Sequence, residues 1–182
     1  DSVFALSAGR VVPGCARQQA GADAGVASAC AASQGTAVGD VDGDGDADVF
    51  VTVSPGGTNQ LWINDGDGVF DEQAAARNVD GPFAKTGNAA AFGDVDGDGD
   101  IDLYVSYDGS ANELYINDGG GGTFTQVAAD RDVTDTAAGR GFAFGDVDGD
   151  GDDDVDLYVC NAGTGNLLYV NGGARHGGDC GW

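Results

Sequence analysis

One short acidic motif occurs three times along the chain at nearly constant spacing, and this repetition restricts the fold more than any other feature of the sequence. Gly39–Asp48 reads GDVDGDGDAD, Gly93–Asp102 reads GDVDGDGDID, and the third copy, GDVDGDGDDDVD, runs from Gly145 to Asp156. The first aspartates of successive copies are 54 and then 52 residues apart. Self-similarity at a period of about 20–50 residues is typical of proteins built from stacked units. The chain is therefore expected to consist of three copies of one unit.

Each unit is predicted to contain four short β-strands. Runs rich in β-branched and aromatic residues follow each acidic motif, a second motif of the form Asn-x-Leu-Trp/Tyr-Ile/Val-Asn keeps the same spacing, and a Gly-rich turn precedes a fourth run. The runs after the first are Val49–Val53, Asn59–Asn64 and Val69–Gln73 in the first unit, Leu103–Ser106, Asn112–Asn117 and Thr123–Val127 in the second, and Leu157–Cys160 and Asn166–Asn171 in the third. Four strands in about fifty residues are typical of a propeller blade. We predict an all-β fold of three four-stranded blades of β-propeller type, which are too few to close a ring within one chain.

The acidic motif has the pattern of a cation site. In D-x-D-G-D-G-D-x-D, alternate side chains converge when the backbone curls, and glycine allows the positive φ that the curl needs. Five hard oxygen ligands on one short loop favour Ca²⁺, because Mg²⁺ retains its waters and is seldom enclosed by protein ligands alone. We therefore predict three Ca²⁺ sites, with Asp46 and its counterpart Asp100 binding through their backbone carbonyls. The predicted ligands are Asp40, Asp42, Asp44, Asp46 and Asp48 in the first loop, Asp94, Asp96, Asp98, Asp100 and Asp102 in the second, and Asp146, Asp148, Asp150, Asp152 and Asp154 in the third.

The last ligand of the third loop has two candidates, because this copy is two residues longer. Counting from the start of the motif selects Asp154, whereas alignment on the following strand selects Asp156; we prefer Asp154. An EF-hand is rejected for all three loops, because its bidentate Glu at the twelfth position is replaced by Val51, Val105 and Leu157.

The repeated unit resembles the FG-GAP/VCBS-like repeat, which also occurs in the propellers of integrin α-chains. The residues that carry the resemblance are A-F-G-D-V-D-G-D-G-D-x-D-L-Y-V, followed by N-x-L-Y-x-N-x-G-x-G-x-F. The resemblance extends from about Gly35 through nearly all of the chain. It implies four-stranded blades, one Ca²⁺ per loop and extracellular or cell-surface roles in adhesion and recognition.

The third unit lacks a run equivalent to its fourth strand, and the N-terminus supplies a candidate. Residues 1–12 match the fourth strand of the other units and the segment that leaves it. The unit boundaries that follow are an N-terminal strand at 1–12, a linker at 13–34, repeat 1 at 35–88, repeat 2 at 89–140 and repeat 3 at 141–182. We expect residues 1–12 to be donated to the third repeat of a neighbouring molecule, giving a ring or a filament, of which we favour the filament. The alternative is that residues 1–12 fold back within their own chain or stay loose.

Composition excludes several functions. The chain has 31 acidic and 7 basic residues, a net charge of −24, which argues against nucleic acid and against an anionic membrane surface as partners. Of the acids, 17 lie in the three acidic motifs, so the charge chiefly describes the predicted metal sites. No residue pattern for catalysis is found and His176 is the only histidine, so no catalytic residue and no enzyme activity is predicted.

Two further observations indicate an extracellular protein. The chain has no Met, which we interpret as a mature chain whose leader was removed; the alternative is that it is a fragment of a longer protein. Its four cysteines form an even set without zinc-site spacing. Three pairings are open; we favour Cys15–Cys30, which would pin the linker, and Cys160–Cys180.

Two sets of repeated residues are interpreted as structural. Trp62 aligns with Tyr115 and Tyr169, which favours core packing over a sugar-stacking platform. Arg77 and Arg131 occupy the same place in their units, which suggests a repeated pair with a carboxylate.

The sequence thus predicts a secreted, calcium-binding structural or adhesive element that self-assembles head to tail, with itself as partner. The alternative is a recognition module for a glycan or a cell-surface protein.

Overall fold

The structure is a computed structural model that describes residues 32–54, 57–83, 85–149 and 155–172, and these residues form β-strands, turns and loops without an α-helix. The first sheet contains β1 (Ala32–Gly39), β2 (Asp48–Ser54), β3 (Gln60–Asn64) and β4 (Phe70–Glu72). The second contains β5 (Gly87–Gly93), β6 (Asp102–Tyr107), β7 (Ser110–Asn117) and β8 (Phe124–Gln126). The third contains β9 (Ala138–Gly145), β10 (Asp156–Ala162) and β11 (Leu167–Tyr169). The described residues contain no helix that could span a membrane.

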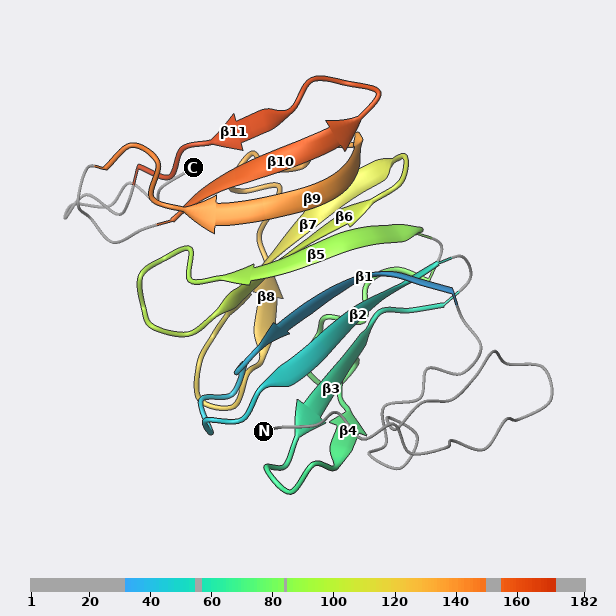
Figure 1. The fold of residues 1–182 in the computed structure, drawn as a ribbon, viewed down its shortest axis with the longest axis vertical. Coiled ribbons are helices and arrows are strands. Elements are labelled where there is room, and N and C mark those ends of the chain that lie inside the picture. The colour runs from blue at the N-terminus through green and yellow to red at the C-terminus, as the bar shows by residue number, and fades with distance from the viewer. Residues whose placement is uncertain (1–31, 55–56, 84, 150–154, 173–182) are drawn as a thin grey trace, which may run out of the picture.

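Each sheet is an antiparallel meander in which neighbours in sequence are neighbours in space. The strand orders are β1-β2-β3-β4, β5-β6-β7-β8 and β9-β10-β11. The sheets lie one after another, with β1 beside β5 and β5 beside β9 (Figure 1). The all-β prediction is confirmed, and none of the sheets is closed; that the sheets belong to a propeller stays a prediction.

The first strand of each sheet begins before the unit boundary expected from the sequence. β1, β5 and β9 start at Ala32, Gly87 and Ala138, against expected starts at 35, 89 and 141. Near the beginning of each of these strands the register shifts at a β-bulge. The bulge interrupts the alternation of residues in the sequence, but strand pairing resumes on its other side. The last residues of the segment expected to be a linker, 32–34, therefore belong to β1.

Two apolar junctions hold the sheets together. The first junction lies between the first and second sheets, and the second junction lies between the second and third sheets. The first buries Phe50, Leu61 and Ile63 against Leu103, Val105, Tyr115 and Phe124. The second buries Tyr104 and Leu114 against Leu157 and Val159, with Phe142, Phe144 and Tyr169 packed around them. Trp62 is buried as well, which confirms its predicted place in the core.

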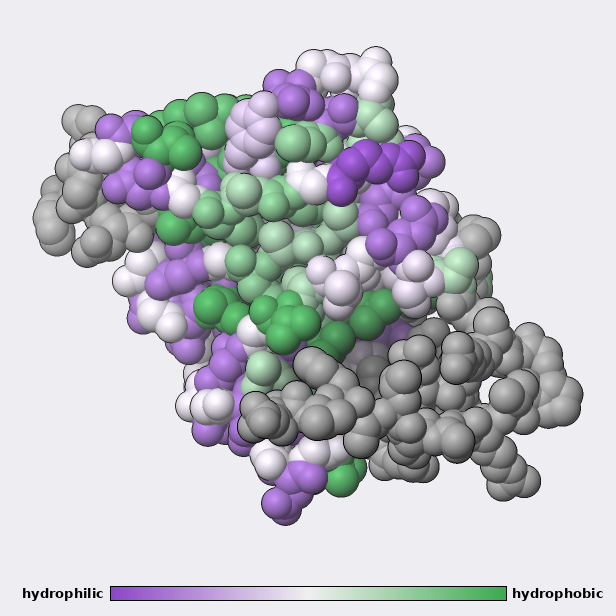
Figure 2. All heavy atoms as spheres, in the orientation of Figure 1, coloured by the Kyte–Doolittle hydropathy of each residue, from purple (hydrophilic) through white to green (hydrophobic). Residues whose placement is uncertain are grey.

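The strands β1, β5 and β9 approach one another closely because they carry small residues. A Cβ placed on Gly35 of β1 would lie 2.5 Å from Cα of Ala89 in β5, so only glycine fits there. Figure 2 shows apolar side chains along the middle of this face, over β9, β5 and β1, with hydrophilic residues at its margins. The close packing of these strands places the turns that follow them, which are the acidic motifs, at one end of the sheets.

Several sequence predictions concern residues outside the described ranges. They include the strand expected at 1–12, the linker before residue 32, and the cysteines Cys15, Cys30 and Cys180. Cys160 is exposed and is a free thiol in the structure, so its predicted pairing with Cys180 is not seen.

Candidate metal sites

Each acidic motif forms the turn between the first and second strands of its sheet. In the first loop, Asp40 accepts hydrogen bonds from the backbone N–H groups of Gly43 and Gly45, at 2.9 Å each. These two glycines have φ of +73° and +95°, which is why the turn needs glycine there. Asp44 accepts a bond from the N–H of Asp46 at 2.9 Å. The loop thus curls around its own carboxylates.

The second loop repeats these contacts atom for atom. Asp94 accepts from Gly97 at 2.9 Å and from Gly99 at 3.0 Å, and Asp98 accepts from the N–H of Asp100. In the third loop Asp146 accepts from Gly149 at 2.6 Å. The described part of the third loop therefore begins in the same conformation.

The last aspartate of each motif anchors the loop to the hairpin behind it. Both oxygens of Asp48 accept backbone bonds, from Val41 and from Asn64, each at 2.9 Å. Asp102 accepts from Val95 and Asn117, and Asp156 accepts from Val147 and Asn171, at 2.7–2.8 Å. These three carboxylates are almost completely buried.

Three carboxylates converge in each loop. One oxygen from each member of a cluster lies within 4.8 Å of the others, and the clusters are Asp40, Asp42 and Asp48; Asp94, Asp96 and Asp102; Asp146, Asp148 and Asp156. Eight of these nine residues are predicted ligands, and the ninth, Asp156, is the alternative that the sequence left open. Asp150, Asp152 and Asp154 lie outside the described residues, so a role for them stays a prediction. The other predicted ligands of the first two loops are not in these clusters: Asp44 and Asp98, and also Asp46 and Asp100, whose predicted ligand atoms are backbone carbonyl oxygens.

Asp156 belongs to the third cluster because the last carboxylate of each cluster is positioned by the start of a strand and not by its count along the loop. It opens β10 just as Asp48 and Asp102 open β2 and β6. Alignment on the strand therefore identifies the structural counterpart, and the two extra residues fall within the loop.

The carboxylates of the clusters carry an electrostatic cost. The pKa of Asp102 is raised from its usual 3.8 to about 7, chiefly by burial and to a smaller extent by the neighbouring Asp96 and Asp94, against the lowering effect of its two backbone bonds. Burial also raises the pKa of Asp48 and of Asp96. A cation between the carboxylates would remove this cost.

The first cluster also contains an acceptor without a partner. Oδ1 of Asp42 is buried and makes no hydrogen bond within the described part of the chain. An orphaned carboxylate oxygen beside two further carboxylates fits a hard divalent cation, which prefers oxygen ligands. The three clusters can therefore each hold a metal ion.

Arg77 confirms the predicted pairing of arginine with a carboxylate. Its Nη2 lies 2.9 Å from Oδ2 of Asp42. Its Nη1 donates to the backbone oxygen of Gly121 in the Gly-rich turn of the second sheet. In the second unit, the charge of Arg131 lowers the pKa of Asp96, opposing the larger effect of burial. Arg77 thus connects the first loop to the next sheet.

Two asparagines that the sequence analysis assigned only to strands also bridge the loops. Nδ2 of Asn117 donates to the backbone oxygen of Val41 in the preceding loop at 2.9 Å, and Nδ2 of Asn171 donates in the same way to Val95 at 2.6 Å. The signal was present in the sequence, because both residues end the second repeated motif. The first and second clusters are therefore tied to the adjacent sheet as well as to their own.

Comparison with protein families agrees with this geometry. The model of the FG-GAP-like repeat matches residues 40–105 and 94–156. No curated protein matches the chain significantly. Repeats of this family suggest an adhesive or recognition module of the extracellular type. The two matches span more than half of the chain, which therefore belongs to the FG-GAP-like repeat family.

Proposed function

We propose that the protein is a secreted, calcium-dependent structural or adhesive element that assembles head to tail. The proposal has two parts, calcium binding by the three loops and association through the two ends of the stack of sheets. The observation that carries it is a set of exposed apolar residues on one face of the third sheet.

Calcium is the cation that the clusters fit best. All side-chain donors are carboxylates, and Ca²⁺ takes six to eight oxygens in a flexible arrangement. Asp40, Asp42 and Asp48 would hold it in the first loop, and their counterparts would do so in the others. Bound calcium supplies positive charge that offsets the repulsion between these carboxylates. Asn117 and Asn171 then transmit the order of the first and second loops to the next sheet.

The third sheet exposes apolar residues whose counterparts are covered in the other sheets. Tyr104 has no exposed surface, whereas its counterpart Tyr158 is 40% exposed. Leu114 is 1% exposed and its counterpart Leu168 is 48% exposed. The same contrast holds for Val147, which is 60% exposed while Val41 and Val95 are buried. These positions are covered wherever another sheet follows, so in the third sheet they form half of a junction that no other described sheet completes. We call Tyr158, Leu168, Val170 and Val147 the outer face.

The first sheet presents the complementary half of such a junction. Val38 occupies the position that Phe92 and Phe144 hold in β5 and β9, and it is 63% exposed. Val49 and Val51 of β2 are half-buried, whereas Leu103 and Val105 at the same positions are covered completely. A second copy placed with its first sheet on the outer face would continue the series of junctions already present within the chain. Such a contact is heterologous, so it generates a ring or a filament.

The edge of the third sheet supports strand addition at the same contact. β3 and β7 each pair with a fourth strand, but no described residue pairs with the free side of β11. An unpaired edge is a template for another strand. We propose residues 1–12 of the neighbouring copy as that strand.

Sedimentation velocity and electron microscopy of the chain in calcium test this proposal. We expect concentration-dependent oligomers or filaments in calcium that dissociate in EDTA. Leu168→Asp should prevent assembly, because it places a charge in the centre of the contact. Val69→Asp is the matched control, since Val69 is 54% exposed but lies outside the outer face. Deletion of residues 1–12 tests strand donation separately.

The outcomes separate the parts of the proposal. A folded wild-type chain that remains monomeric at high concentration in calcium would overturn self-assembly and favour the recognition module. Assembly that survives the deletion but not Leu168→Asp would overturn strand donation alone. We propose no enzymatic activity.

A further inference from the structure

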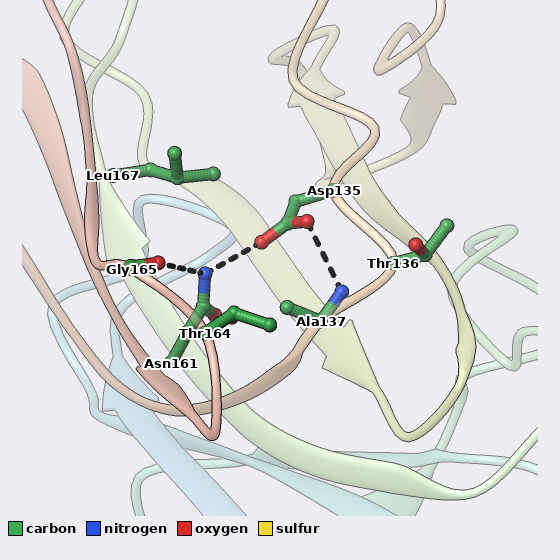
Figure 3. Close-up of a pocket in the computed structure, with 7 residues that line it drawn as sticks. All are labelled: Asp135, Thr136, Ala137, Asn161, Thr164, Gly165 and Leu167. Carbon is green, nitrogen blue, oxygen red and sulfur yellow. Dashed lines mark hydrogen bonds between the residues drawn. The ribbon is translucent and has the colours of Figure 1, made fainter.

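A cavity opens at the second junction, away from the acidic loops. It has a volume of about 440 Å³ and lies between the segment before β9 and the hairpin that joins β10 to β11 (Figure 3). Its lining residues are Asp135, Thr136, Ala137, Asn161, Thr164, Gly165 and Leu167. The metal clusters share none of these residues.

The equivalent place at the first junction is filled by a lysine and its partners. Nζ of Lys85 donates to Oε1 of Glu113 at 2.8 Å and to the backbone oxygen of Ala111 at 2.9 Å. The ammonium also lies 4.5 Å from the centre of the Tyr107 ring. The hydroxyl of Tyr107 donates to Oε2 of Glu113 at 2.7 Å. An ammonium on an aliphatic chain thus completes the first junction.

Strand register identifies the counterparts at the second junction. Gly87 pairs with Tyr107 and Gly139 pairs with Asn161, so Asn161 stands where Tyr107 stands. Two residues before these glycines lie Lys85 and Ala137, which are therefore equivalent.

The third member follows from the second motif. Glu113 comes directly after Asn112, and Leu167 comes directly after the equivalent Asn166. All three counterparts, Ala137, Asn161 and Leu167, line the cavity. The cavity therefore exists because shorter or apolar side chains replace the lysine and its partners.

The polar groups of the cavity are mostly acceptors. Asp135 accepts from the N–H of Ala137 at 3.0 Å and from Nδ2 of Asn161 at 2.7 Å. Nδ2 of Asn161 also donates to the backbone oxygen of Gly165 at 3.2 Å, which fixes the orientation of the amide (Figure 3). Oδ1 of Asn161 is then a buried acceptor that has no partner among the described residues. A carboxylate retains further lone pairs after two bonds.

We propose that this cavity binds a primary ammonium on a short aliphatic chain, of the kind that a lysine side chain or a small alkylamine presents. The ammonium bonds to the carboxylate of Asp135 beside the Asn161 amide, and the aliphatic chain packs on Leu167. The ligand takes the place that Lys85 fills at the first junction. The inference is independent of self-assembly, because the outer face contributes none of the lining residues.

The test is an NMR titration of the calcium-loaded chain with n-butylammonium, which reproduces the end of a lysine side chain. We expect saturable shifts of the Asn161 side-chain amide and of the Ala137 and Gly165 backbone amides. n-Butanol, of equal length without the charge, should not produce them. Asp135→Asn should weaken binding about tenfold, as expected for loss of a charged hydrogen-bond partner. Asp80→Asn, in the corresponding segment of the first unit, is the matched control and should leave binding unchanged.

Ala137→Lys provides an independent variant. The introduced lysine should occupy the cavity as Lys85 does and abolish butylammonium binding, while the spectrum remains that of a folded chain. Absence of saturable shifts in the folded wild-type protein would overturn the proposal. Equal response to butanol, or unchanged binding by the Asp135→Asn variant, would overturn it too.

A second arm distinguishes the source of the ammonium. A peptide with one internal lysine that binds more tightly than butylammonium identifies a protein partner, whereas equal or weaker binding identifies a free amine. Both outcomes support an ammonium site.

Discussion

The acidic loops and the sheet junctions are repeated with very different fidelity. Asp48, Asp102 and Asp156 each accept two backbone bonds from the same two positions of their units. At the junctions, by contrast, Lys85 and Glu113 of the first have the counterparts Ala137 and Leu167 in the second.

The difference reflects what each region must do. A metal cluster needs particular atoms at particular distances, so a change of one carboxylate removes a ligand. A junction needs buried volume and satisfied polar groups, which several combinations of side chains supply. The loops therefore carry the common property of the repeats, and the junctions carry what is individual to each.

Removal of calcium should have the largest effect, because it acts on all three loops together. At a calcium concentration about 100-fold above the dissociation constant, each site contributes about 2.7 kcal/mol, or roughly 8 kcal/mol for three. This is comparable with the whole stability of an ordinary domain. We expect EDTA to abolish cooperative unfolding or to lower the melting temperature greatly, as measured by circular dichroism. An unchanged melting temperature would contradict a structural role for the loops.

The next largest expected effect is a dependence of the stability of the calcium-free protein on pH. Burial raises the pKa of Asp102 from 3.8 to about 7, so between these values the folded state binds more protons than the unfolded state. The free energy of unfolding in EDTA should therefore fall as pH rises from about 4 to about 7. Urea unfolding at several pH values measures this fall. Asp102→Asn should flatten it, and a stability that rises through the same range would show that burial does not govern this carboxyl.

Replacement of Glu113 tests how much the polar contacts of the first junction stabilise the fold. Glu113→Leu gives the first junction the residue of the second. It removes the carboxylate that accepts from the hydroxyls of Tyr107 and Tyr115 and from the ammonium of Lys85, which keeps only the backbone oxygen of Ala111. We expect a loss of about 3 kcal/mol in the free energy of unfolding. Calcium stoichiometry should not change.

A double-mutant cycle provides the control for this variant. Glu113→Leu should cost at least about 1 kcal/mol less in a Lys85→Ala background, because the charge partner is already absent. Equal costs in both backgrounds would show that the pair is not coupled.

The smallest expected effect comes from replacing one predicted ligand of the third loop. Asp156→Asn should reduce bound calcium from three ions to two, because Asp156 holds the position of Asp48 and Asp102. Asp154→Asn should leave three. The opposite result would favour counting from the start of the motif over alignment on the strand. Calcium titration calorimetry of the two variants decides between them.

Much of the fold and of the site was predictable from the sequence, because repetition is visible in one dimension. Three copies of D-x-D-G-D-G-D identified the loops, and the alternation after them identified the strands. Of the two candidates for the last ligand of the third loop, Asp156 is the first residue of β10 and lies in the third cluster, whereas Asp154 lies outside the described residues, so the choice between them stays a prediction.

Contacts between units were harder to predict. The bonds of Asn117 and Asn171 to the preceding loop, and the filling of the first junction by Lys85, depend on which positions of different sheets face each other. Strand pairing within a unit does not determine this relation. The cavity at Asn161 could not be predicted for the same reason, because the sequence does not show which side chains meet at each junction.

The central claim is that the three carboxylate clusters are calcium sites. Calorimetric titration of Ca²⁺ into the chelator-stripped chain, with bound metal counted by elemental analysis after dialysis, tests it most directly. Three calcium ions per chain, bound in preference to magnesium, are the predicted result. A chain that binds no calcium, or that binds magnesium equally well, would contradict it.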